Sequence, residues 1–175
     1  MRKRLREALD EMTAQPAEAH EEILRRLAED HSHTINALHG AYPVGDYTCA
    51  VYAFGLVDNA TYRGVAGWGL GRTFAGKDFV EFSIDHHLTE IPAGTAQPED
   101  FVIYFDESGF KHIGLLGDEG RVVSKWGTGL LLEHGLWEVP SAYGDHIRYF
   151  DGLDRGQAFE AFICYAESNG FQFDR

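Results

Sequence analysis

The sequence predicts an α+β fold, in which helices flank an antiparallel sheet of about five strands. Two observations predict this class. Apolar residues recur at helical spacing near both ends of the chain, and short β-rich runs alternate with turn formers over 101–150. The expected order is N-terminal helices, a short helix that carries a cysteine, the sheet, and a C-terminal helix. A length of 175 residues suits one core.

The N-terminal region is expected to be helical. Residues 2–12 and roughly 17–38 have helical spacing, and Pro16 suits the break between the two helices. We assign 1–40 to an N-terminal helical extension and 41–175 to the α+β domain, together forming a single compact unit. The extension is either a hairpin packed on the core or an arm that contacts another subunit.

A cysteine is expected at the start of a short helix. Residues 44–56 predict a loop that enters an apolar helix. Asp46 and Thr48 are both suited to cap this helix, and either cap places Cys49 in its first turn.

Five short strands are expected in the second half of the chain. The β-rich runs are 101–105, 112–116, 121–126, 130–139 and 146–150. The connections are short, which favours antiparallel hairpins. Ahead of the sheet, a Gly-rich connection at 57–77 leads to a short helix at 78–88. After the sheet, 155–170 predicts an amphipathic helix.

Composition narrows the range of partners. Acidic residues outnumber basic ones by 28 to 15, for a formal net charge of −13. This excess repels phosphate backbones and anionic lipids, so we expect no nucleic acid and no membrane partner, whereas a basic protein would be attracted. The basic first residues are not followed by the apolar core of a signal peptide, which predicts a cytoplasmic protein or one delivered by a secretion system. The oligomeric state is left open.

Neither a cofactor nor a metal is expected. The sequence lacks a Walker loop, a dinucleotide-binding glycine fingerprint and an HExxH helix. Asp85-His86-His87 does not suit a metal ion, because adjacent residues on a helix point about 100° apart. The two cysteines, Cys49 and Cys164, are expected to be reduced, and Cys164 lies on the apolar face of the last predicted helix.

Cys49 and His112 are a candidate catalytic pair. A nucleophilic cysteine needs partial ionisation, which the positive end of a helix favours, and a histidine base within hydrogen-bond reach. Cys49 heads a predicted helix, and His112 begins a predicted strand. Ser124 lies on the following strand across a tight turn, where it shares a face with His112 if the register allows. Ser124 is therefore the candidate third residue that orients the imidazole.

This layout resembles the NlpC and CHAP branch of the papain-like cysteine hydrolases. The matching stretches are TCAVYAFGL (48–56), PEDFVIYFDESGFKHIGLL (98–116) and GRVVSKWG (120–127). The resemblance implies a papain-like core with Cys49 as nucleophile and His112 as base. The third residue of that family is usually His, Asn or Gln, so Ser124 is a departure, and Lys125 or His134 is an alternative.

The polar and aromatic segment 124–150 is expected to line a substrate groove. The substrate-binding candidates are Tyr47, Lys125, Trp126, Glu133, His134 and Tyr143. The backbone N–H of Cys49 and the side chain of Tyr47 are candidate oxyanion donors. The expected substrate is a peptide or another amide or ester, cleaved by this peptidase or amidase through a covalent thioester, with acyl transfer as an alternative outcome.

Two other hypotheses compete with the hydrolase. Cysteine is among the most buried residue types, so Cys49 also suits a core position. The same fold without activity would be a binding module, or an immunity or regulatory protein that attracts a basic partner. A thiol packed in hydrocarbon, or turned away from His112, would favour these alternatives.

Overall fold

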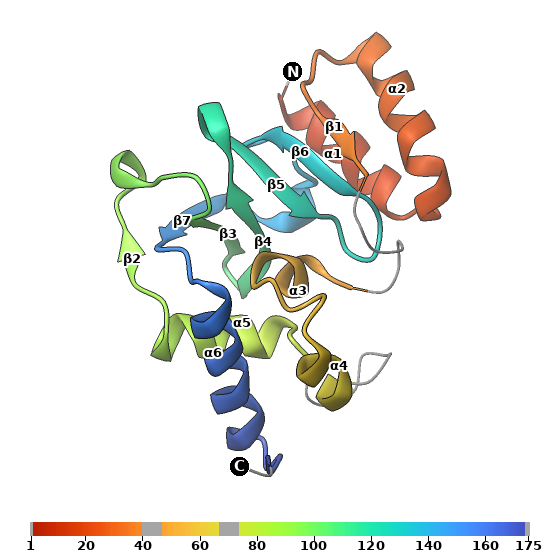
Figure 1. The fold of residues 1–175 in the computed structure, drawn as a ribbon. Helices are drawn as coiled ribbons and strands as arrows, with labels where there is room; N and C mark the ends of the chain where they lie inside the picture. The colour runs from red at the N-terminus through yellow and green to blue at the C-terminus, as the bar shows by residue number, and fades with distance from the viewer. Residues whose placement is uncertain (1, 40–46, 67–73, 174–175) are drawn as a thin grey trace.

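An antiparallel sheet forms the centre of the molecule. A computed structural model describes residues 2–39, 47–66 and 74–173, and within them the sheet has seven strands in the order β1-β6-β5-β4-β3-β7-β2 (Figure 1). The strands are β1 (Asn36–Leu38), β2 (Glu90–Ile91), β3 (Phe101–Asp106), β4 (Gly109–Leu116), β5 (Arg121–Lys125), β6 (Leu131–Gly135) and β7 (His146–Phe150). The predicted α+β class is confirmed. β1 and β2 add to the five expected strands, and β6 is shorter than the expected run at 130–139.

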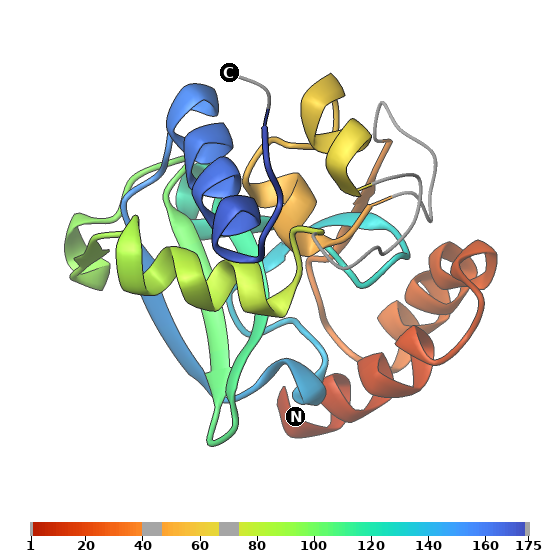
Figure 2. The same cartoon turned by 90° about the horizontal axis from the view of Figure 1, so that it is seen from below.

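Six α-helices accompany the sheet in the described residues. They are α1 (Arg2–Thr13), α2 (His20–Asp30), α3 (Cys49–Ala53), α4 (Ala60–Ala66), α5 (Lys77–His86) and α6 (Arg155–Ser168), with a short 3-10 turn η4 (Ser141–Tyr143) before β7. Figure 2 shows α5 and α6 lying against each other over the sheet, apart from α1 and α2. None of the helices in the described ranges combines the length and apolar character needed to cross a bilayer.

Both faces of the sheet are covered, which explains the uninterrupted apolar run of β3. Phe101 and Ile103 pack into a first core with α3, α5 and α6. Val102 and Tyr104 point the other way, into a second core with α1 and α2. Because neighbouring side chains in a strand alternate between faces, a strand buried on both faces must be apolar throughout.

The N-terminal helices pack on the sheet. Leu5 and Leu9 of α1 are buried in the second core, and the Arg6 guanidinium donates to the Val139 carbonyl at 3.0 Å. The helix expected over 17–38 ends at Asp30, and that prediction is wrong beyond this point. Residues 36–38 instead form β1, which pairs with β6.

The helix that carries the cysteine forms where the sequence predicts it. Thr48 occupies the N-cap position of α3, and its hydroxyl donates to the Ala75 carbonyl at 3.4 Å instead of accepting from the helix. Asp46, the other expected cap, lies outside the described residues. The expected connection at 57–77 contains α4, and its residues 67–73 also lie outside the described part.

Candidate functional site

Cys49 is the first residue of α3, which packs on β4 and β5. Ala50, Val51 and Ala53 of this helix are buried in the first core and hold it against the sheet. Cys49 itself is partly exposed and unpaired by any disulfide. The helix therefore places Cys49 at the boundary between the core and the surface.

The surroundings of Cys49 have opposing effects on the pKa of its thiol. Burial of the sulfur is the largest effect, and it raises the pKa of Cys49 above the ordinary value. The backbone N–H groups of Ile113, Ala50 and Cys49 itself lower the pKa, as does the ammonium of Lys125. The effect of burial on the pKa is larger than that of these groups together. The thiol in this structure is therefore protonated at neutral pH, although several groups around it favour the thiolate.

Lys125 lies on the same side of the sheet as Cys49. Its side chain is only 1% exposed. The ammonium donates to the Gly129 carbonyl and lies 4.5 Å from the centre of the Tyr47 ring. A buried ammonium needs such partners, because an unpaired charge in the interior is costly. Lys125 thus places a fixed positive charge near the thiol.

His112 faces the second core, on the other side of β4 from Ile113. Its imidazole is stacked on Tyr143, with ring centres 4.0 Å apart and planes 17° from parallel, and lies 5.7 Å from the Tyr104 ring. Burial, followed by the nearby His134, lowers the pKa of His112 well below the ordinary value. The ring is therefore neutral at pH 7 in this position.

The Nε2 atom of His112 is buried without a hydrogen-bond partner. The imidazole is only 1% exposed, and no hydrogen bond joins it to Cys49 in the described part of the chain. The expected Cys–His hydrogen bond is therefore not formed in this conformation. Cys49 packs against the first core and His112 against rings of the second core, and β4 lies between the two cores.

Tyr143 adjoins both of these environments. Its ring covers His112, and its pKa is raised first by burial and next by the nearby thiol of Cys49. The backbone N–H of Gly127 lowers the pKa of the Tyr143 hydroxyl, but by less than burial raises it. Of the six expected substrate-binding residues, Tyr143 is the one that contacts His112 by ring stacking.

Ser124 does not orient His112. Its hydroxyl lies 2.8 Å from His134 Nε2 and accepts a hydrogen bond from Trp126 Nε1 at 3.1 Å. Ser124 and His134 are 0% exposed and Trp126 is 1% exposed. The expected role of Ser124 is therefore corrected to that of a buried structural link, because its hydroxyl is bonded to His134 and Trp126 and not to His112.

Most of the expected groove residues are buried or already paired. Lys125, Trp126 and His134 have no surface available to line a groove. Glu133 forms an ion pair with Arg121 at 3.5 Å. Only Tyr47 among the six borders the pocket described next. These predictions fail because the sequence does not indicate which polar residues of a strand face the interior.

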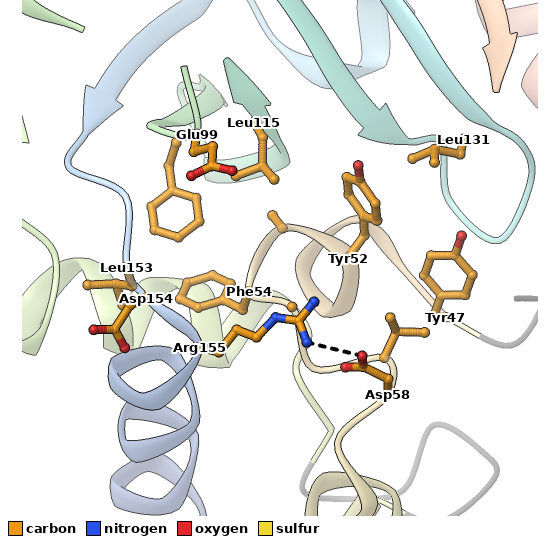
Figure 3. Close-up of a pocket in the computed structure, with 14 residues that line it drawn as sticks. Tyr47, Tyr52, Phe54, Asp58, Glu99, Leu115, Leu131, Leu153, Asp154 and Arg155 are labelled. Carbon is orange, nitrogen blue, oxygen red and sulfur yellow. Dashed lines mark hydrogen bonds and ion pairs between the residues drawn. The ribbon is translucent and has the colours of Figure 1, made fainter. Parts of the chain in front are cut away.

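A pocket of about 720 Å³ runs along the flank of α3. Figure 3 shows Tyr47 and Tyr52 on one side of it, Glu99 and Leu115 on another, and Arg155 reaching from α6 towards Asp58. Cys49 is not part of the lining, but Tyr52 is three residues further along the same helix. That spacing puts the two side chains on one face of α3, and it is the sequence signal that would have identified Tyr52. Glu99 and Arg155 have no comparable local signal.

The described residues contain no group of three or more His, Cys, Asp or Glu side chains arranged to hold a metal ion. Cys164 on α6 is partly exposed and not bonded to Cys49. Comparison of the chain with family models, curated proteins and solved structures gives no match.

Proposed function

We propose that this protein is a cysteine hydrolase of the papain-like type, in which Cys49 attacks the carbonyl of an amide or ester. The proposal is carried by His112 Nε2, which is buried without a partner on the residue adjacent to Ile113, whose N–H faces the thiol. An unsatisfied buried polar atom costs about 1–3 kcal/mol. A catalytic role is one of the reasons for which a protein keeps such a group.

The proposed reaction starts with transfer of the Cys49 proton to His112 Nε2. The thiolate then bonds to the substrate carbonyl carbon, and the leaving amine or alcohol takes the proton from the imidazolium as its bond to that carbon breaks. Water cleaves the resulting thioester, which releases the acid and restores the thiol. The N–H groups around the sulfur, together with Lys125, stabilise the thiolate while it forms.

A side-chain movement is part of this proposal. Proton transfer requires the sulfur and the imidazole nitrogen within about 3–4 Å, and no hydrogen bond joins them in the described structure. His112 would therefore have to leave its stacked position on Tyr143 to approach the thiol. Tyr143 would hold the resting position of the base.

A non-catalytic binding module is the second candidate. The raised pKa of Cys49 and its packing against the first core favour it, since a thiol that stays protonated is a poor nucleophile. The two candidates differ in one measurable property, which is whether the reactivity of Cys49 depends on His112.

Alkylation by iodoacetamide, followed between about pH 5 and about pH 10, tests the proposal. The measurement uses a Cys164→Ala background so that Cys49 is the thiol observed. Although the pKa of Cys49 is raised in the resting conformation, we expect the approach of His112 to let Cys49 react near pH 6–7, and His112→Asn to slow that reaction by about tenfold or more. His86→Asn, an exposed histidine on α5, is the matched control and leaves the rate unchanged.

The opposite result would replace the hydrolase by the binding module. In that case Cys49 does not react with iodoacetamide, or it reacts only at a pH near the ordinary thiol pKa whether or not His112 is present. Circular dichroism of each variant separates a lost base from a lost fold. If the Cys–His dependence is found, a screen of peptide amides and esters follows, with Cys49→Ala as the inactive control.

A further inference from the structure

The pocket beside α3 begins one helical turn from the proposed nucleophile. Cys49 and Tyr52 are three residues apart on α3, and the Tyr47 and Tyr52 rings are 6.5 Å apart. Both tyrosines line the pocket. A substrate whose reacting carbonyl lies at Cys49 would therefore extend its neighbouring side chain into this space.

The walls of the pocket suit an alkyl chain. Besides the two tyrosines, apolar side chains from the residue that follows α3 and from three strands line it, namely Phe54, Phe101, Leu115 and Leu131. At about 720 Å³ the pocket has the size of a small-ligand site. A long unbranched side chain can bury its methylene groups against such walls.

The charged groups in the pocket leave one carboxylate uncommitted. Asp58 pairs with Arg155 at 3.4 Å, and Asp154 accepts from the Gln157 N–H at the start of α6. The Glu99 carboxylate has no hydrogen bond or ion pair with any described residue, and its side chain is exposed towards the pocket (Figure 3).

The backbone holds Glu99 in a fixed position. Its N–H donates to the Leu116 carbonyl at 2.7 Å, and its φ is 76°, in the left-handed region that non-glycine residues rarely adopt. A side chain at this position is less favourable than glycine, because its Cβ approaches the following carbonyl oxygen. The carboxylate is thus presented at the pocket by a strained but well-anchored residue.

We infer that this pocket binds a lysine-like side chain of a peptide, with its alkyl stem on the aromatic wall and its ammonium at Glu99. The net charge of −13 favours the approach of a cationic peptide. An acidic side chain would meet three carboxylates against one arginine that is already paired. The inference rests on the proposed function only in placing the reacting bond at Cys49.

Binding of two matched peptides to the Cys49→Ala protein tests the inference. The probes are acetyl-Ala-Lys-Ala-amide and acetyl-Ala-norleucine-Ala-amide, which differ in the terminal ammonium, and the readout is NMR titration. We expect the lysine peptide to bind about tenfold more tightly, with shifts at Tyr52 and Glu99, and Glu99→Gln to remove this difference.

Glu107→Gln is the matched charge control, because Glu107 is exposed at the opposite end of the β3–β4 hairpin. We expect this variant to keep the preference for lysine. Equal binding of the two peptides, or equal effects of Glu99→Gln and Glu107→Gln, would overturn the inference. Because the protein tested lacks the thiol, the outcome is independent of whether Cys49 hydrolyses anything.

Discussion

At the residue scale, the buried hydrogen bonds of Ser124 and His134 define where the protons lie. The Gly135 carbonyl can only accept, so His134 Nδ1, at 3.0 Å from it, carries a proton. His134 Nε2 is then an acceptor, and the Ser124 hydroxyl donates to it while accepting from Trp126. A serine hydroxyl that donates to a histidine is also the arrangement of serine hydrolases, but here both residues are closed off from substrate.

Removal of the Ser124 hydroxyl should therefore be costly for stability. Ser124→Ala leaves a buried indole N–H and a buried imidazole nitrogen without partners, and we expect a loss of about 1–3 kcal/mol in the free energy of unfolding. Urea denaturation measures it. Ser108→Ala, which removes an exposed hydroxyl bonded to Asp106, should cost less than about 1 kcal/mol. Similar losses in the two variants would contradict this role for Ser124.

Lys125 should influence the acidity of Cys49. Its ammonium is one of the groups that lower the thiol pKa, so Lys125→Met should raise that pKa further and slow alkylation at about pH 8 by about threefold or more. Lys111→Met removes an ammonium paired with Asp106 and serves as the control. An unchanged rate in a folded Lys125→Met protein would show that the charge does not reach the thiol.

At the element scale, Gly114 allows β4 and β5 to approach each other. A Cβ at this position would lie 2.6 Å from Val122 Cγ1 and 2.8 Å from Ser124 Cβ, both closer than real Cβ contacts. The strands pair at Leu115–Val123 and Leu116–Val122, directly beside this point. The glycine two positions after His112 is thus required by the packing of the adjacent strand.

Gly114→Ala should destabilise the protein by about 1–3 kcal/mol, because the extra methyl group forces the two strands apart. Gly64→Ala is the control: Gly64 lies in α4, and a Cβ added there would meet no atom within 4 Å, so alanine should be neutral or stabilising by up to about 1 kcal/mol. Thermal and urea unfolding of both variants measure the difference. A neutral Gly114→Ala would mean that the strands can separate without loss.

Local patterns predicted the elements better than the contacts between them. The five strands from β3 to β7 and the start of α3 at Cys49 follow from β-rich runs, turns and an apolar helix. β1 was not predicted, because Ile35 and Leu38 also fit helical spacing. In addition, its pairing partner β6 is far away in sequence.

Contacts between elements also decide which residues surround Cys49, and local sequence patterns do not predict them. Ser124 and Lys125 are adjacent, so they point to opposite faces of β5, and the sequence does not say which face meets Cys49. The structure puts Lys125 near the thiol and Ser124 in the second core.

At the scale of the whole molecule, two buried neutral histidines make stability depend on pH. Burial lowers the pKa of His134 to about 4, from 6.5 in the unfolded chain, and lowers that of His112 in the same direction. Between pH 6.5 and about pH 4, His134 binds more protons in the unfolded state than in the folded state. The free energy of unfolding therefore falls as the pH decreases from 6.5 towards 4. The full effect of His134 is on the order of 3 kcal/mol.

The carboxylate of Asp106 acts in a lower pH range. Asp106, whose pKa is lowered to about 2 by its hydrogen bonds to Ser108 and Lys111, loses its contribution only as the pH falls from 3.8 towards 2. Glu90 and Glu138, whose pKa values are lowered from 4.5, begin to lose their contribution near about pH 5. A loss of stability that is already present at about pH 6 is therefore assigned to the histidines. This separation in pH allows the two groups to be tested individually.

Urea unfolding between about pH 4.5 and about pH 7.5 tests this assignment. We expect wild type to lose stability steadily below pH 6.5, and His134→Gln to be less stable at pH 7 but flatter across this range, because its side chain does not titrate. His146→Gln, an exposed histidine on β7, should keep the wild-type slope. A slope that is the same in all three proteins would assign the pH dependence to other groups and would contradict a neutral, buried His134.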